Sequence, residues 1–430
     1  MGTPEKNSLS IVPQISKKLT YRTLFLVIVF GSLGGGLLWF MKVRGDLNGL
    51  HTTDTVGWIA AVEYGPQSQE AVLISRDGTI HKDPGHIAQS TDRDVVWSPK
   101  GNFLYYVSDR VDHNFNLFRW IPDSTEPAEQ RTIGTRARSN LKFPAQPSDD
   151  SDNVAKGLIT TGGLVQEFDP TNQSTEQILP PTSKEITTSK GGEEQGTEGQ
   201  FEGYYGSLGT SFREAQWCNN HHTIVAVMRR DSGEILIAQD MKMGDGKFPP
   251  PHAIIAGDHI DFAVNPKDGN VIYCLNGFQW PDAASANAGP DGKKPKKPFI
   301  NAVGGVDFEG KNFVIAANQG ELTFGSPAIS PDGATVVVIL GKVTNGESNP
   351  IGMAIMPATD NSSFKRRQFK GDIHEPSWSP DGTRILAAVR LPGKPRTIFE
   401  IPIDGSPPRN VTGDQGSFGF PHYSPQTKAN

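Results

Sequence analysis

A short motif recurs along the chain, and it restricts the fold more than any other feature. Its fullest copy is Trp378-Ser379-Pro380-Asp381-Gly382, followed by an apolar run from Arg384 to Val389. Proline fixes φ and glycine accepts a positive φ, so Pro-Asp-Gly between two apolar runs predicts a tight hairpin. The pattern returns at 97–101 and 329–333. Recurrence of one hairpin indicates a repeat architecture in which each repeat is a small sheet.

Weaker copies of the motif extend the series. They lie at 217–221, at 264–269, in a degenerate repeat over 136–180 with its first strand near Phe143, and in a truncated form at Tyr423-Ser424-Pro425. Seven innermost strands are therefore expected, near positions 97, 143, 217, 264, 329, 378 and 423. Sheets this small are stable only when stacked, and radial stacking gives an all-β propeller. Seven blades are predicted, with six as the alternative.

The two ends of the repeat region are predicted to form one blade. The last copy stops after its first strand, whereas the hairpin at 56–75 has no first strand of its own. Pairing the two would close the ring and leave no exposed sheet edge. The propeller is accordingly assigned to residues 56–430. Two polar stretches, near 181–200 and 281–298, interrupt it and are interpreted as surface loops.

The N-terminal region has a different character. Residues 1–22 form a polar tail with four basic side chains, residues 23–41 include an uncharged apolar run from Leu24 to Met41, and residues 42–55 form a spacer. The apolar run is long enough to span a bilayer as one helix, and a cleaved signal peptide is the alternative. The basic tail places the N-terminus in the cytoplasm and the propeller in the periplasm or outside the cell.

Composition excludes several classes of protein. A net charge of −6 over 430 residues does not suggest a nucleic-acid surface. Cys218 and Cys274 are the only cysteines, which excludes a disulfide scaffold and a cysteine-rich zinc site. Both fall in predicted strands of neighbouring repeats, so buried free thiols are expected, with a single disulfide as the alternative.

Candidate site residues lie just ahead of the predicted innermost strands, where side chains should face the axial channel. They form the pairs Arg93 and Asp94, Arg213 and Glu214, His259 and Asp261, and His374 and Glu375. His259, Asp261, His374 and Glu375 are the candidate ligands for a divalent metal or a charged small molecule. The alternative is that these charged residues pair across blades. No spacing among them is specific for a metal.

A serine-hydrolase site is not predicted. Such a site needs a Gly-x-Ser-x-Gly elbow with an acid and a histidine, and the nearest stretch, Gly325-Ser326-Pro327, lacks that pattern. No catalytic residue and no cofactor is therefore assigned, and the chain is not expected to be an enzyme.

The repeated motif resembles the repeats of the TolB family and of the related propellers of prolyl-oligopeptidase-type and tricorn-type proteases. The resemblance covers roughly residues 90–430. TolB has a separate α/β domain ahead of its propeller, whereas this chain has the apolar segment and spacer there. TolB is also a soluble periplasmic protein, so the membrane anchor expected here rests on the apolar segment alone. The resemblance implies that the propeller binds envelope proteins as a scaffold module. The alternative is a channel-site enzyme or a small-ligand or metal-binding sensor, as in polysaccharide-lyase propellers.

Overall fold

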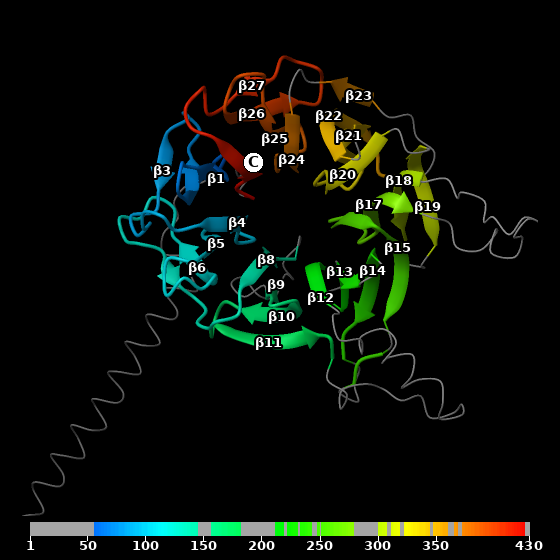
Figure 1. Ribbon diagram of the computed structural model, residues 1–430, viewed down its shortest axis with the longest axis horizontal. Coiled ribbons are helices and arrows are strands. Elements are labelled where there is room, and N and C mark those ends of the chain that lie inside the picture. The colour runs from blue at the N-terminus through cyan, green and yellow to red at the C-terminus, as the bar shows by residue number, and fades with distance from the viewer. Residues whose placement is uncertain are drawn as a thin grey trace, which may run out of the picture. The chain divides into compact units, whose positions relative to one another are not determined.

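The computed structural model describes thirteen stretches of the chain. They are residues 56–144, 156–181, 211–218, 222–230, 233–242, 247–249, 251–278, 300–307, 311–318, 322–344, 347–359, 365–368 and 372–425. Residues 51–430 form one compact unit. Its described strands make seven four-stranded antiparallel sheets, which stand as blades around a central axis (Figure 1). The predicted all-β propeller with seven blades is confirmed.

The strands of each blade are given in order from the innermost to the outermost. Blade 1 contains β28 (Phe418–Tyr423), β1 (Ile59–Tyr64), β2 (Gln69–Ile74) and β3 (Ile80–Lys82). Blade 2 contains β4 (Asp92–Trp97), β5 (Leu104–Ser108), β6 (Asn116–Trp120) and β7 (Glu129–Gln130). Blade 3 contains β8 (Arg138–Lys142), β9 (Gly157–Thr161), β10 (Leu164–Asp169) and β11 (Ser174–Leu179). Blade 4 contains β12 (Ser211–Trp217), β13 (Thr223–Arg230), β14 (Gly233–Asp240) and β15 (His252–Gly257).

The remaining blades follow the same order. Blade 5 contains β16 (His259–Val264), β17 (Val271–Phe278), β18 (Ile300–Val306) and β19 (Asn312–Asn318). Blade 6 contains β20 (Leu322–Ile329), β21 (Thr335–Thr344), β22 (Glu347–Pro357) and β23 (Lys365–Gln368). Blade 7 contains β24 (Asp372–Trp378), β25 (Arg384–Arg390), β26 (Arg396–Pro402) and β27 (Arg409–Asn410).

Blade 1 closes the ring in the predicted way. Its innermost strand, β28, comes from the C-terminal end of the propeller, and the other three strands come from the N-terminal end. β28 pairs antiparallel with β1, with Ile59 opposite Tyr423 and Glu63 opposite Phe418. The backbone groups at the edge of β1 are therefore hydrogen-bonded to β28, and neither incomplete repeat leaves this edge unpaired.

The repeated motif forms the turn between the first and second strands of a blade. In blade 7 the Ser379 amide donates to the Arg384 carbonyl oxygen at 2.9 Å, and the Gly382 amide donates to the Ser379 carbonyl oxygen at 2.9 Å. Gly382 has φ +68°, a conformation that glycine adopts without steric cost. These turns lie on one face of the ring, here called the turn face. The innermost strands begin at the opposite face, called the mouth face.

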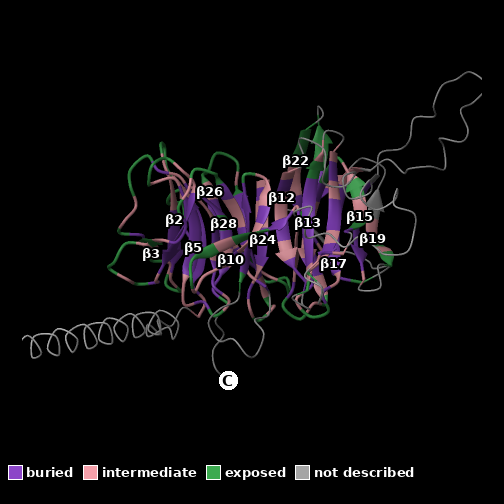
Figure 2. Cartoon of the chain, turned by 90° about the horizontal axis from the view of Figure 1, so that it is seen from below, coloured by how far each residue is buried: buried purple, intermediate pink, exposed green. Residues whose placement is uncertain are grey.

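The core lies between neighbouring blades. In the first hairpin Ile59, Ala60, Ala61 and Val62 are all buried, without the alternation of a sheet that has one solvated face. Each sheet is covered on both faces by the adjacent blades, so the strand next to the innermost one is mostly buried (Figure 2). The β21–β22 hairpin differs, since its tip is exposed and projects from the mouth face beyond the other strands (Figure 2).

Several sequence predictions fall on residues that the structure does not describe. These are the tail at 1–22, the span at 23–41 and the spacer at 42–55, together with most of the loops near 181–200 and 281–298. No helix that is long and apolar enough to cross a bilayer occurs within the described ranges. Cys218 and Cys274 are buried free thiols, as predicted.

Candidate functional site in the axial channel

The axial channel contains a cavity of about 790 Å³. Its lining comes from all seven innermost strands and is both apolar and charged. Among the described residues that line it, four carry carboxylates, namely Asp94, Glu214, Asp261 and Glu375, and Lys142 is the only lysine or arginine. This excess of carboxylates makes the cavity electrostatically suited to a cationic group.

Several innermost strands are bulged where they line the cavity. The pairing register shifts in β4, β8, β20 and β24, and the residues at the shifts include Asp94, Asn140, Ser326 and Glu375. These four residues have φ values of 54°, 52°, 47° and 54°. A non-glycine residue in this left-handed region is strained, and it persists only where surrounding contacts hold it. The bulges turn the side chains of Asp94, Asn140 and Glu375 toward the next blade.

The bulge side chains connect neighbouring blades. Asp94 Oδ2 accepts from the Asn140 amide at 3.1 Å, and Glu375 Oε2 accepts from the Phe420 amide at 2.5 Å. Asp261, at the corresponding position of the unbulged β16, accepts from the Ser326 amide at 3.0 Å through Oδ2. Each bond joins one blade to the bulge residue of the following blade. We call these three carboxylate bonds the inter-blade latches.

A cluster of charged side chains joins blades 4 and 5. Arg213 forms two hydrogen bonds with Glu234, from Nε to Oε1 at 3.0 Å and from Nη2 to Oε2 at 3.1 Å. Its Nη1 also lies 3.4 Å from Asp261 Oδ1. His259 Nε2 lies 3.1 Å from the same Asp261 oxygen, and His259 Nδ1 lies 3.6 Å from Glu234 Oε2. The cluster therefore shares Asp261 with an inter-blade latch.

The cluster shifts the titration of its members. The hydrogen bond to Asp261 raises the pKa of His259 above its ordinary value. Burial alone would raise the pKa of Asp261, but the His259 hydrogen bond and charge hold it below its ordinary value. Both effects favour an ion pair, with His259 protonated and Asp261 ionised.

His374 and Glu375 behave differently from His259 and Asp261. Burial, followed by the charge of Arg396, lowers the pKa of His374. Burial raises the pKa of Glu375 despite its bond from the Phe420 amide. Within the described chain His374 Nε2 is buried without a hydrogen-bond partner. These two neighbours thus form no ion pair with each other.

The predicted location of the candidate residues was wrong in one respect. Asp94, Glu214, Asp261 and Glu375 lie inside the innermost strands rather than ahead of them, because β4, β12, β16 and β24 extend beyond their apolar segments. Pairing of charged side chains across blades is observed for Arg213 with Asp261, whereas the cross-blade partners of Asp94 and Glu375 are backbone amides. Among the described residues no three His, Cys, Asp or Glu side chains are grouped as metal ligands. His259 and Asp261 meet, and His374 stays apart from them.

Sequence reasoning missed Asn140, Ser326 and Phe420, whose backbone amides donate the hydrogen bonds of the latches. A usable signal was present, because Ser326, Glu375 and Phe420 each precede a proline. Proline inside a strand is confined to edges and bulges, so an X-Pro step within an innermost strand marks a bulge. Asp94 and Asn140 carry no such mark, but Asp and Asn tolerate the left-handed region better than other residues.

The fold defines the class of protein: the chain forms a β-propeller with seven blades, and its repeated motif resembles the repeats of the TolB family. No family model matches the chain, and no curated protein matches it. Solved structures do resemble it. TolB from Acinetobacter baumannii is 13% identical and aligns over 87% of this chain and 68% of that one, with a TM-score of 0.47.

Two enzymes with propellers are comparably similar. The puromycin hydrolase S511A mutant complexed with PGG is 12% identical over 87% of this chain, with a TM-score of 0.52. The alignment spans 55% of the hydrolase. An oligogalacturonate lyase in complex with manganese is 10% identical over 83% of this chain and 85% of its own length, with a TM-score of 0.48. At such identities the likeness extends to the fold alone.

Proposed function

We propose that this protein is a protein-binding module of the cell envelope, which uses the mouth face and axial cavity of its propeller to hold a partner. The observation that carries the proposal is the use of the channel carboxylates. The carboxylates of Asp94, Asp261 and Glu375 each accept a hydrogen bond from a backbone amide of the next blade. Groups that hold the ring together are poorly placed to exchange protons or ligands, whereas a rigid ring with exposed loops suits recognition.

The proposed location follows from the sequence. Residues 23–41 would anchor the chain in the cytoplasmic membrane, with the propeller outside the cytoplasm. Washing isolated membranes with high salt and then with alkaline carbonate tests this. A spanning helix keeps the chain in the pellet under both treatments. Release by either treatment would contradict the anchor while leaving the binding proposal open.

Mild cross-linking of the full chain in its native membranes tests the binding proposal. The informative variant is Glu214→Lys, because Glu214 lines the cavity and is 17% exposed. It forms no inter-blade latch, and its contact with another blade is the ion pair with Lys142 of blade 3 at 3.8 Å. The matched control is Glu126→Lys, an exposed residue between β6 and β7 on the turn face. We expect a specific envelope protein to be captured by the wild type and by Glu126→Lys, and its yield to fall several-fold with Glu214→Lys. Equal capture by all three chains would contradict a role for the cavity.

A second candidate function is binding of a small cation or a divalent metal. The observation that favours it is the excess of carboxylates around the cavity. Metal analysis of the purified full chain provides the test. Stoichiometric metal that is lost on His259→Ala and on His374→Ala would support this candidate, and a metal-free wild-type chain would exclude the metal form of it.

A further inference from the structure

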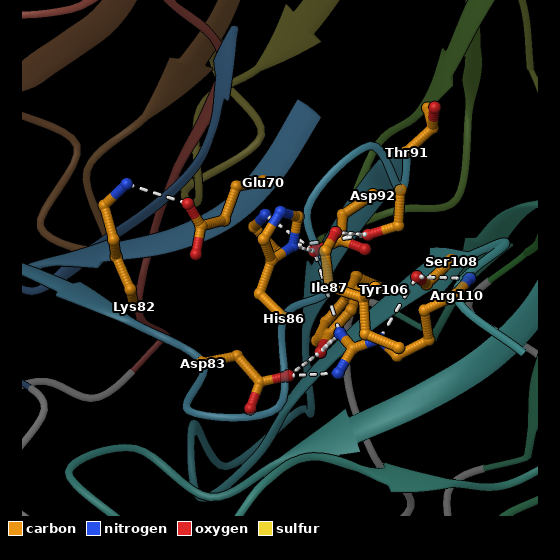
Figure 3. A network of polar contacts seen from close by, with 12 residues as sticks. Glu70, Lys82, Asp83, His86, Ile87, Thr91, Asp92, Tyr106, Ser108 and Arg110 are labelled. Atoms are coloured by element: carbon orange, nitrogen blue, oxygen red, sulfur yellow. Dashed lines mark hydrogen bonds and ion pairs between the residues drawn. The ribbon is translucent and has the colours of Figure 1, made fainter. Parts of the chain in front are cut away.

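A second polar network lies away from the channel, between blade 1 and blade 2 (Figure 3). Asp83 and His86 belong to the connection from β3 to β4, Asp92 begins β4, and Tyr106 and Arg110 lie in and just after β5. Blade 1 is the blade that closes the ring from the two ends of the propeller. This network therefore joins the closing blade to its neighbour, and we call it the seam.

Hydrogen bonds cross the seam from both sides. The Ala71 amide of β2 donates to Asp92 Oδ2 of β4 at 3.2 Å. In the other direction, Asp83 Oδ1 accepts from the Ala128 amide of blade 2 at 2.9 Å. Asp83 Oδ2 also accepts from Tyr106 at 2.5 Å and pairs with Arg110 Nη1 at 2.5 Å. Asp83, Asp92 and Arg110 have side chains at most 4% exposed.

His86 is the one titratable group of the seam that changes charge near neutral pH. Its Nδ1 lies 3.2 Å from Asp92 Oδ2 and 3.5 Å from Ser90 Oγ. Both contacts use the same ring nitrogen, so the three residues do not form the relay of a serine hydrolase, which needs one partner on each nitrogen. In the described part of the protein His86 Nε2 and Asp92 Oδ1 are buried without partners.

Carboxylates outnumber permanently positive groups in the part of the seam that surrounds His86. Glu70 lies on β2, where Lys82 bridges it to Glu63 at 2.7 Å from each carboxylate. Arg110 Nη2 lies 3.7 Å from Asp92 Oδ2, in addition to its bond with Asp83. Two permanent cations, Lys82 and Arg110, are thus shared among four carboxylates, of which Asp92 and Glu70 act on His86. Protonation of His86 adds a positive charge beside a buried carboxylate, where the attraction is strong.

We propose that the contact between His86 and Asp92 is a proton-responsive clasp, which tightens the seam between blades 1 and 2 when His86 is protonated and loosens it when His86 is neutral. The hydrogen bond to Asp92 raises the pKa of His86 above its ordinary value. A raised pKa in the folded state means that the stabilisation is fully present below the unfolded value of about 6.5. It is lost as the pH rises through the folded value. A chain outside the cytoplasm would experience such changes in its surroundings.

Amide hydrogen exchange of the purified full chain tests the clasp. Between about pH 5.5 and pH 8.5, after correction for the chemical exchange rate, we expect opening of peptides over 69–74 and 83–92 to increase by about three-fold or more, while β26 is unchanged. His86→Gln should abolish this response. His113→Gln, which changes an exposed histidine between β5 and β6, should leave it as in the wild type. An equal response in His86→Gln and the wild type would overturn the proposal.

A direct titration keeps the proposal testable if His86→Gln folds poorly. In this experiment the pH titration of the His86 ring resonance is compared between the wild type and Asp92→Asn. That variant keeps an oxygen acceptor for the Ala71 amide and removes the charge. We expect the wild-type resonance to titrate above the free imidazole value of about 6.5, and the Asp92→Asn resonance to titrate lower than the wild type. A wild-type midpoint at or below the free value would overturn the clasp.

Discussion

The hairpin serine completes the repeated turn at the scale of single residues. Ser379 Oγ donates to Asp381 Oδ1 at 2.5 Å and accepts from the Arg384 amide at 3.0 Å. Ser330 makes the equivalent bonds with Asp332 and Thr335, at 2.5 and 3.0 Å. Proline and glycine were enough to predict the turn from the sequence. The serine was not assigned a role, because its bonds form only after the two strands have paired.

Replacing this serine should weaken the fold measurably. Ser379 is 1% exposed, so Ser379→Ala leaves the Arg384 amide without its buried acceptor. We expect a loss of about 1–3 kcal/mol in the free energy of unfolding, measured by denaturant titration at unchanged slope. Ser406→Ala is the control, because Ser406 is exposed in the turn between β26 and β27 and its backbone amide bonds to Asp404. A similar loss in both variants would contradict the role of the hydroxyl.

Two substitutions of Glu375 distinguish the effect of its hydrogen bond to the Phe420 amide from the effect of its negative charge. Glu375→Gln keeps an oxygen for the Phe420 amide, whereas Glu375→Ala removes it. Burial raises the pKa of Glu375 in the folded state, so its ionisation opposes folding increasingly as the pH rises above the unfolded value. We therefore expect Glu375→Ala to lose about 1–3 kcal/mol at pH 7. Glu375→Gln should match the wild type near pH 4 and equal or exceed it at pH 7.

Thermal unfolding of the three chains from pH 4 to pH 7 measures both effects. If Glu375→Gln proves as unstable as Glu375→Ala at pH 7, the carboxylate charge itself is needed in the channel. That outcome would favour a bound cation over a structural latch.

The innermost strand is the element in which sequence prediction and structure differ most. The hairpin motif located all seven of these strands, because turn chemistry is local and repeats in the sequence. The bulges were not predicted, since register depends on the partner strand and on the next blade. Consequently Asp94 and Glu375 were placed ahead of their strands, and the amides that they bind were not foreseen. The X-Pro steps at Ser326, Glu375 and Phe420 were the available signal.

The motif tryptophans should differ in importance from blade to blade. Trp378 Nε1 donates to the Ala328 carbonyl oxygen of blade 6 at 2.9 Å, and Trp97 Nε1 donates to the His422 carbonyl oxygen of blade 1 at 3.1 Å. Within the described residues Trp217 Nε1 is buried without a partner. Trp378→Phe should therefore cost about 1–2 kcal/mol more than Trp217→Phe, because only the former removes a hydrogen bond between blades. Chemical denaturation of both variants measures the difference, and equal costs would show that ring volume alone matters.

Closure of the ring is a property of the whole molecule. The C-terminal strand β28 completes blade 1, and its neighbours on both sides also depend on it. The Phe420 amide donates the latch hydrogen bond to Glu375 of blade 7, and the His422 carbonyl oxygen accepts a hydrogen bond from Trp97 Nε1 of blade 2. Tyr423 also donates a hydrogen bond to Glu400 of blade 7. The sequence predicted the shared blade from two incomplete repeats, but these three side-chain bonds to other blades follow from the closed geometry.

Removing β28 should therefore open the ring as a unit. A chain ending at Thr412 would expose the edge of β1 and break the contacts on both flanks of blade 1. We expect this chain to self-associate and to lose the single cooperative thermal transition, measured by light scattering after size exclusion and by calorimetry. The control chain ends at Pro425 and retains β28, so it should behave like the full chain. A monomeric Thr412 chain with an unchanged transition would show that six blades and an incomplete seventh suffice. In that case β28 would have a role other than closure.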